Sequence, residues 1–132
     1  MNEKKTYKRE DGAARNKSYG FAIRIVKMVN YLQQGKKERV LSKQILRSGT
    51  AVGALIREAE YAQSRADFVN KLNIALKEAN ETDYWLNLLK DCGYIQEEAF
   101  KSMASDCGEL IALLTQSIKT SESKNKLQED GE

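Results

Sequence analysis

The amino-acid sequence predicts an all-α fold, an antiparallel up-and-down four-helix bundle. The chain of 132 residues contains no proline and only 8 glycines, so it lacks the frequent turns of a β-sandwich or barrel. Its apolar residues recur at steps of three and four, which is the spacing of one helix face. Four such segments follow one another with short polar connections between them, which favours antiparallel neighbours.

The first helix is expected over residues 16–35, with Asn16 or Ser18 as its cap. Its main stripe consists of Phe21, Ile25, Met28 and Leu32. A second set of apolar residues widens this stripe and indicates burial on two sides, as in a bundle position with an oligomer contact: Ile23, Val26 and Val29. Residues 1–15 are polar and without period, and they are expected to form a flexible basic arm.

A charged turn at residues 36–39 precedes the second helix, for which Ser42 is the expected N-cap. Its stripe consists of Ile45, Gly49, Val52, Ile56 and Ala59. Glycine inside a helix costs about 1 kcal/mol relative to alanine, so Gly49 and Gly53 require an explanation. We favour close approach of a neighbouring helix over phosphate binding, because no strand or P-loop lysine pattern accompanies them.

Ser64 and Asp67 have the spacing of a capping box and are predicted to begin the third helix. Its stripe consists of Phe68, Leu72, Ala75, Ala79, Leu86 and Leu89, and Gly93 is expected to end it. The fourth helix has the most regular repeat, formed by Phe100, Met103, Cys107, Leu110 and Leu114. The bundle is therefore expected to span residues 16–120, with a flexible tail at 121–132.

The chain has no histidine, which removes the commonest general base and metal ligand. We therefore expect neither an enzyme nor a cofactor. Cys92 and Cys107 are expected about 15 Å or more apart along a helix axis, too far for a disulfide. No apolar run approaches the roughly 20 residues of a membrane span, and no signal-peptide core is apparent, so a cytoplasmic location is expected.

Charge is distributed unevenly along the sequence. Residues 1–50 hold 13 Lys and Arg against 4 Asp and Glu, whereas the remainder holds 9 against 15. The basic half is expected to face either a polyanion or the acidic half of a neighbouring subunit. The candidate nucleic-acid-binding residues are Arg24, Lys27, Lys36, Lys37, Arg39, Lys43 and Arg47; a plain solvated face is the alternative.

The acidic residues Glu58, Glu78 and Glu81 have two possible roles. A structural network of ion pairs is favoured, and its expected members are Arg47, Arg57, Glu58, Arg65, Glu78 and Glu81. The alternative is a metal site at the three glutamates, but a di-iron bundle uses Glu-x-x-His on two helices. Tyr84 and Trp85 are assigned to a core or subunit interface in preference to base stacking.

The stretch from Leu41 to Tyr94 resembles the 23S ribosomal RNA intervening-sequence (S23) family of four-helix bundles. The resemblance rests on three segments: QILRSGTAVGALIREA, AQSRADFVNKLNIALKEANETDYWLNLL and the following GYI. Relatives of this family include the accessory protein of diversity-generating retroelements. The resemblance implies a homopentameric barrel with a basic surface that binds nucleic acid. Many relatives have serine and asparagine where this chain has Ala51 and Leu55, and this joint change fits a packing surface.

Together these features predict a non-catalytic, nucleic-acid-binding protein that acts as a homo-oligomeric ring of five subunits. Structured RNA is the expected ligand, and the basic residues named above are its expected contacts. The expected partners are further copies of the chain, RNA or DNA, and a nucleic-acid-processing protein. The alternative is a protein-interaction or scaffold module in which acidic and basic halves meet across subunits without nucleic acid.

Overall fold

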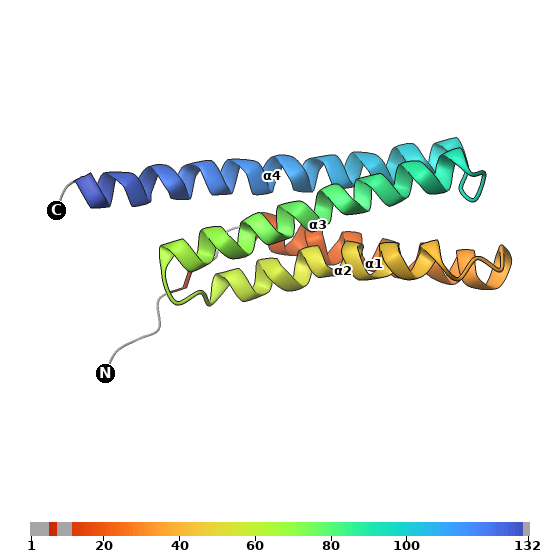
Figure 1. Ribbon diagram of the computed structural model, residues 1–132, viewed down its shortest axis with the longest axis horizontal. Helices are drawn as coiled ribbons and strands as arrows, with labels where there is room; N and C mark the ends of the chain where they lie inside the picture. The colour runs from red at the N-terminus through yellow and green to blue at the C-terminus, as the bar shows by residue number, and fades with distance from the viewer. Residues whose placement is uncertain (1–5, 8–11, 131–132) are drawn as a thin grey trace.

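A computed structural model describes the chain at residues 6–7 and 12–130. It contains four helices, α1 (Ala13–Gly35), α2 (Leu41–Glu60), α3 (Arg65–Asp91) and α4 (Glu97–Asp130). Consecutive helices run in opposite directions and lie side by side along one long axis (Figure 1). The predicted four-helix bundle is therefore confirmed.

The four helices do not pack equally tightly. Extensive contacts join α1 to α2, α2 to α3 and α3 to α4, whereas α1 and α4 touch over a much smaller area. Consecutive helices thus pack closely on one another, while the side between the first and last helices is partly open. This opening leaves a groove between α1 and α4.

The core contains most of the apolar stripes that the sequence predicts. Its fully buried large side chains come from all four helices, and they include Phe21, Ile25, Leu32, Ile45, Val52, Leu86, Leu89, Leu110 and Leu114. One polar pair is enclosed among them, because Thr82 donates a hydrogen bond to Ser48 over 2.9 Å between α3 and α2. Met28 belongs to the predicted stripe but is only partly buried, since it lies on the open side.

The two glycines of α2 allow α1 to approach closely, as predicted. A Cβ on Gly49 would stand 2.8 Å from Cγ1 of Ile25, and one on Gly53 would stand 3.4 Å from the backbone oxygen of Ser18. Both contacts are with α1. The glycines therefore serve helix packing, which offsets their cost in helix propensity.

The helix starts differ from prediction at two of three positions. Helix α1 begins at Ala13 after a left-handed Gly12, so neither Asn16 nor Ser18 caps it; Ser18 is buried and donates to the carbonyl of Arg15. Ser42 does not cap α2, because it already lies inside the helix, which begins at Leu41, and its Oγ donates to the carbonyl of Glu38 over 3.0 Å.

The start of α3 agrees with prediction. Ser64 Oγ accepts a hydrogen bond from the backbone N–H of Asp67 over 3.1 Å. The Asp67 carboxylate reaches back to the N–H of Gln63, one residue before the N-cap. Two backbone donors at the helix start are thereby satisfied, which is the purpose of a capping box.

Both predicted domain boundaries need adjustment. Helix α1 already includes residues 13–15; most of the predicted arm, at residues 1–5 and 8–11, lies outside the described residues. Tyr7 is described: its N–H donates to the carbonyl of Glu60 over 2.9 Å, and its ring stacks on Phe68 at 5.1 Å.

Helix α4 continues to Asp130, so the boundary at Thr120 is wrong. Ser121 is still buried, and the lysines and glutamate beyond it favour helix.

Candidate nucleic-acid interface

The connection between α1 and α2 is organised by Glu38, the one acid in a basic turn. Its Oε1 accepts hydrogen bonds from the N–H groups of Val40 and Leu41, and its Oε2 accepts one from Ser42, all over 2.8–2.9 Å. These donors belong to the first turn of α2, where backbone N–H groups lack partners within the helix. Glu38 therefore caps α2 and fixes the path of the turn.

The environment of Glu38 keeps its carboxylate charged. Burial raises the pKa of Glu38, but hydrogen bonds from the backbone N–H groups of Leu41, Ser42 and Val40 together outweigh that effect, and the pKa lies below its ordinary value. Only 8% of the residue is exposed. Its negative charge is thus directed inward at the helix start, away from solvent.

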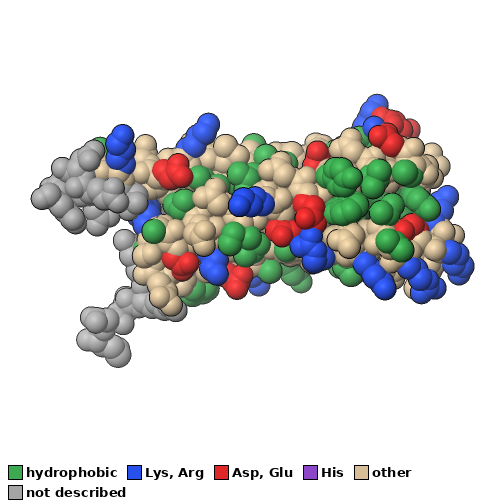
Figure 2. All heavy atoms as spheres, in the orientation of Figure 1, with side chains coloured by type: hydrophobic (Ala, Val, Ile, Leu, Met, Phe, Trp, Pro, Cys, Tyr) green, Lys and Arg blue, Asp and Glu red, His purple; other side chains and the backbone are tan. Residues whose placement is uncertain are grey.

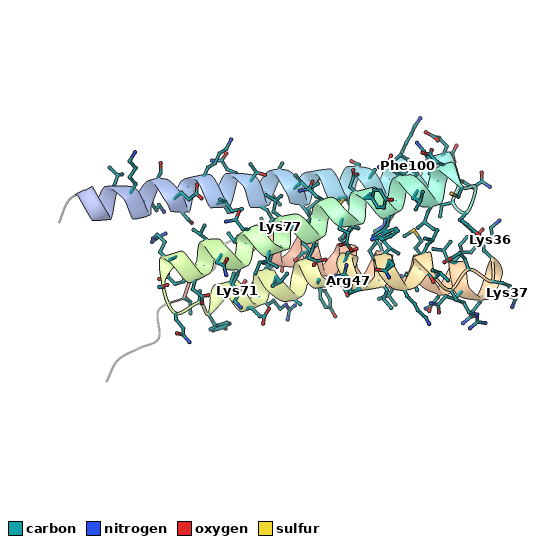
Figure 3. The ribbon with its side chains drawn as sticks, in the orientation of Figure 1. Lys36, Lys37, Arg47, Lys71, Lys77 and Phe100 are labelled. Carbon is teal, nitrogen blue, oxygen red and sulfur yellow. The ribbon has the colours of Figure 1, made fainter. Side chains whose placement is uncertain are left out.

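The cations around Glu38 point outward. We define the basic edge as Lys36, Lys37, Arg39 and Lys43, all of which are exposed and form no ion pair with a described residue. Figure 2 shows Lys and Arg side chains gathered at this end of the bundle, and Figure 3 labels Lys36 and Lys37 at its tip. A fixed turn with outward cations is suited to phosphate contacts.

Lys37 has an unusual backbone conformation within this edge. Its φ is 58°, in the left-handed region, where a side chain costs roughly 1–2 kcal/mol. This conformation lets the N–H of Glu38 donate to the carbonyl of Leu32 over 2.9 Å, which closes the end of α1. Glycine is the usual residue for such a position, so lysine is present there despite the strain.

Two predicted nucleic-acid-binding arginines are neutralised by acidic residues of the same chain. Arg24 donates to Asp106 over 2.5 Å and to Ser102 over 2.8 Å, and these contacts join α1 to α4. Arg47 donates to Glu78 over 3.1 Å and also to Glu81; Figure 3 shows it near the middle of the bundle, away from Lys36 and Lys37. Lys27 is exposed and has no ion-pair partner among the described residues.

The structure brings together only part of the predicted ion-pair network. Arg47, Glu78 and Glu81 meet, and Trp85 Nε1 donates to Glu81 Oε2 over 3.1 Å. The remaining members lie elsewhere. Arg57 lies over the ring of Tyr19 at 5.2 Å, Arg65 lies over Tyr7 at 5.5 Å, and Glu58 is exposed without an ion pair to any described residue. Inclusion of these three residues was wrong, because none of them forms an ion pair with Arg47, Glu78 or Glu81.

The aromatic pair of α3 is divided between core and surface. Trp85 packs against the core and is partly buried, whereas Tyr84 is exposed. Their rings meet edge to face with centroids 5.0 Å apart. The assignment to the core thus applies to Trp85 alone.

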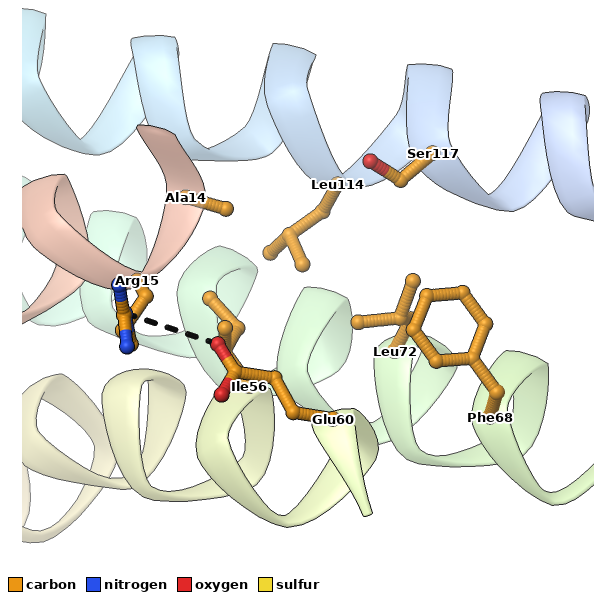
Figure 4. A pocket seen from close by; sticks show the side chains of 8 residues that line it. All are labelled: Ala14, Arg15, Ile56, Glu60, Phe68, Leu72, Leu114 and Ser117. Carbon is orange, nitrogen blue, oxygen red and sulfur yellow. Dashed lines mark ion pairs between the residues drawn. The ribbon is translucent and has the colours of Figure 1, made fainter. Parts of the chain in front are cut away.

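A small cavity lies where the beginning of α1 meets the end of α2 (Figure 4). Its volume of about 40 Å³ suits a water molecule and is too small for an organic ligand. Arg15 lies 3.7 Å from the buried Glu60, and Arg15 Nε donates no hydrogen bond to a described residue. This cavity belongs to the packing of the helix ends.

Sequence reasoning missed the groove on the open side of the bundle. The groove has a volume of about 320 Å³, and Arg24, Lys27, Met28, Tyr31, Ile95, Ala99 and Met103 line it. Periodicity places Met28 in the core and says nothing about Tyr31. The groove lies between α1 and α4, which make fewer contacts than the other neighbouring helices, and such packing between elements far apart in sequence leaves no local signal.

Within residues 6–7 and 12–130, no cluster of three or more Cys, Asp or Glu side chains is arranged to hold a metal ion. Over the same residues, none of the helices has an apolar stretch able to cross a membrane. Both cysteines are free; Cys92 is exposed and Cys107 is buried.

Comparison with known proteins places this geometry in a family. The family model described as 23S rRNA-intervening sequence protein matches residues 10–116. The chain is also similar to a crystal structure from Bacteroides thetaiotaomicron, described as a protein with unknown function from the S23 ribosomal protein family. The two share 58% identity and a TM-score of 0.80, over 80% of this chain and 98% of that chain. No curated protein is significantly similar.

Proposed function

Because the chain belongs to the family of 23S rRNA-intervening sequence proteins, we propose that it is a non-catalytic, RNA-binding protein of the bacterial cytoplasm. The basic edge carries this proposal. Its four cations are exposed, and the one carboxylate among them is bound to backbone N–H groups. Phosphates of structured RNA therefore meet cations without a competing acid in the turn.

The proposed binding unit is a homo-oligomeric ring of five subunits. Support comes from the outer face of α1, where Tyr19, Ile23 and Val26 are exposed at spacings of four and three and form an apolar stripe on one helix side. Such a stripe favours burial against a second copy. A ring would repeat the basic edge and bind one RNA through several contacts, which raises avidity.

Salt dependence tests the electrostatic mechanism. Four phosphate contacts per subunit give a slope of about −3 in log affinity against log salt concentration. Between 50 and 200 mM salt, affinity for a structured RNA should therefore fall about 50-fold or more. Affinity that stays constant over this range would refute the proposed interface.

A scaffold module is the second candidate, because the exposed cations of the basic edge would also pair with acidic residues of a neighbouring copy without RNA. Replacement of Lys36, Lys37 and Lys43 by glutamate distinguishes the two functions. As an RNA-binding protein, the variant keeps its oligomer size and loses RNA. As a scaffold joined by opposite charges, it loses its oligomer. Light scattering with and without structured RNA measures both quantities in one experiment.

A further inference from the structure

The groove between α1 and α4 has the features of a small-ligand site. Its volume of about 320 Å³ is at the lower end of the range for small-molecule pockets. Apolar side chains form its wall, from Met28 on α1 to Ile95, Ala99 and Met103 at the α3–α4 connection and on α4. A space of this size accommodates one aromatic ring system and excludes a helix.

An aromatic side chain stands at the mouth of this groove. Tyr31 lines the groove and remains 51% exposed. Its ring is directed along α1 toward the basic turn, since a Cβ on Gly35 would stand 3.5 Å from Tyr31 Cδ2 and Cε2. An exposed tyrosine over an apolar space offers a flat face for stacking, and methionine sulfur adds favourable contacts with aromatic rings.

Cations accompany the apolar wall. Lys27 lies one helical turn before Tyr31 on the same face of α1, lines the groove, and forms no ion pair with a described residue. Arg24 lies one turn before Lys27 and closes that end of the groove. Its guanidinium donates to Asp106 and Ser102 of α4. An occupant that is complementary to this site has an aromatic body and one anionic group near Lys27.

We propose that the groove binds one unpaired nucleotide of the RNA. The base of this nucleotide stacks on Tyr31, and its phosphate contacts Lys27. This inference rests on the proposed function, because the basic edge would hold the flanking phosphates. The four cations of that edge lie near the end of α1 toward which the Tyr31 ring points. A bulged or terminal nucleotide is the appropriate ligand, since its base leaves the stack at little cost.

Two RNAs that differ only in one nucleotide test the inference. The full chain is titrated with a paired RNA duplex and with the same duplex carrying a single bulged adenosine. Base stacking on protein aromatics is worth about 1–3 kcal/mol, so the wild type should bind the bulged RNA about tenfold more tightly. Both affinities should decline with salt, as the basic edge requires.

Substitutions on the groove define its role. Tyr31→Ala should abolish the preference for the bulge and leave affinity for the paired duplex unchanged. Ala99→Phe, which fills the groove from α4, should do the same. Tyr61→Ala is the matched control, because Tyr61 is another exposed tyrosine that does not line this groove; the variant should retain the tenfold preference.

The outcomes separate this inference from the proposed function. Salt-dependent binding of both RNAs with equal affinity would refute base capture and retain the basic edge. If Tyr31→Ala lowered affinity for both RNAs equally, Tyr31 would act outside the groove. This result would also refute base capture. A change in oligomer size with an unchanged preference would assign the groove to a second copy of the chain. Absence of binding to either RNA would refute both proposals.

Discussion

Gly49 of α2 lies so close to Ile25 of α1 that a Cβ added to it would stand 2.8 Å from Cγ1 and 3.0 Å from Cδ1 of Ile25. Ile25 is fully buried, so its side chain has no room to move aside. The glycine therefore fixes the distance between the two helices. Any larger residue must separate them or distort the core.

Gly49→Ala is expected to destabilise the fold even though alanine favours helix. The gain in propensity is about 1 kcal/mol, whereas an extra carbon in a packed core costs about 1–3 kcal/mol. We expect a net loss of about 1 kcal/mol in urea unfolding. Gly20→Ala is the control: nothing lies within 4 Å of a Cβ there, so stability should rise by up to about 1 kcal/mol. An equal rise in stability in both variants would show that the Ile25 side chain moves aside at little cost.

Glu38 should make the stability of the bundle sensitive to acid. Its folded pKa is lowered, so its contribution is present above the unfolded value of about 4.3 and is lost as the pH falls through the lower folded value. Glu38→Gln should cost about 1–2 kcal/mol at pH 7. The difference from wild type should narrow as the pH falls below about 4.

Glu58→Gln provides the control for this substitution. Glu58 is exposed and lacks an ion pair with any described residue, so its replacement should leave the free energy of unfolding at pH 7 unchanged. A gap between wild type and Glu38→Gln that stays constant from pH 7 to pH 3 would contradict the capping role.

The sequence predicts the helices well because their signals are local. Steps of three and four place Ile25, Val52 and Leu110 in the core, and the spacing of Ser64 and Asp67 identifies a cap that the structure confirms. These features depend on residues within one or two turns of each other. Periodicity and capping preferences therefore suffice.

The candidate site is predicted less completely, since its parts depend on distances between elements. The sequence identifies the exposed lysines, but it includes Arg24 and Arg47, whose partners lie 82 and 31–34 residues further along the chain. It assigns the α2 cap to Ser42, whereas the carboxylate of Glu38, four residues earlier, accepts hydrogen bonds from the N–H groups of residues 40–42 at the helix start. Periodicity does not predict the groove, because it depends on how loosely α1 and α4 pack against each other.

Replacement of Lys37 by glycine should have opposite effects on stability and on RNA binding. Lys37→Gly should raise stability by up to about 1 kcal/mol, because glycine adopts the left-handed conformation without strain. The same change removes a cation, so the slope of log RNA affinity against log salt should become less steep by about 1. Thermal unfolding and an RNA titration at several salt concentrations measure the two effects.

Lys36→Gly separates charge from backbone strain. Lys36 has a right-handed conformation with φ of −103°, so glycine relieves nothing there. In this variant too, the slope of log RNA affinity against log salt should become less steep by about 1, but stability should not rise. If Lys37→Gly also failed to gain stability, the left-handed conformation would carry no strain at this position.

The Arg47–Glu81 pair should couple only weakly. Both side chains are substantially exposed, 51% for Arg47 and 37% for Glu81, and exposed pairs contribute about 0–1 kcal/mol. Glu81→Ala should lower stability by about 1 kcal/mol, because Trp85 Nε1 also loses its acceptor. A double-mutant cycle with Arg47→Ala should give a coupling of about 0.5 kcal/mol. No loss of stability or oligomer size in Glu81→Ala would contradict a structural role.

The two cysteines should differ strongly in reactivity. Burial, with a smaller contribution from Asp83, raises the pKa of Cys107 to about 12, and its Sγ donates to the carbonyl of Ala79 over 3.3 Å. The reactive form of a thiol is the thiolate, so Cys107 is both protonated and inaccessible at pH 8. Cys92 is exposed, and an aromatic disulfide reagent should therefore react rapidly with one thiol per folded chain.

The slow thiol then reports on opening of the core. Because Cys107 is fully buried between α3 and α4, a reagent reaches it only when these helices separate. Its labelling should follow the free energy of that opening and accelerate with urea. In Cys92→Ser the rapid phase should disappear while the slow phase remains. Rapid reaction of both thiols in the folded wild type would place Cys107 in a locally open region, and would contradict the tight packing of α4 against α3.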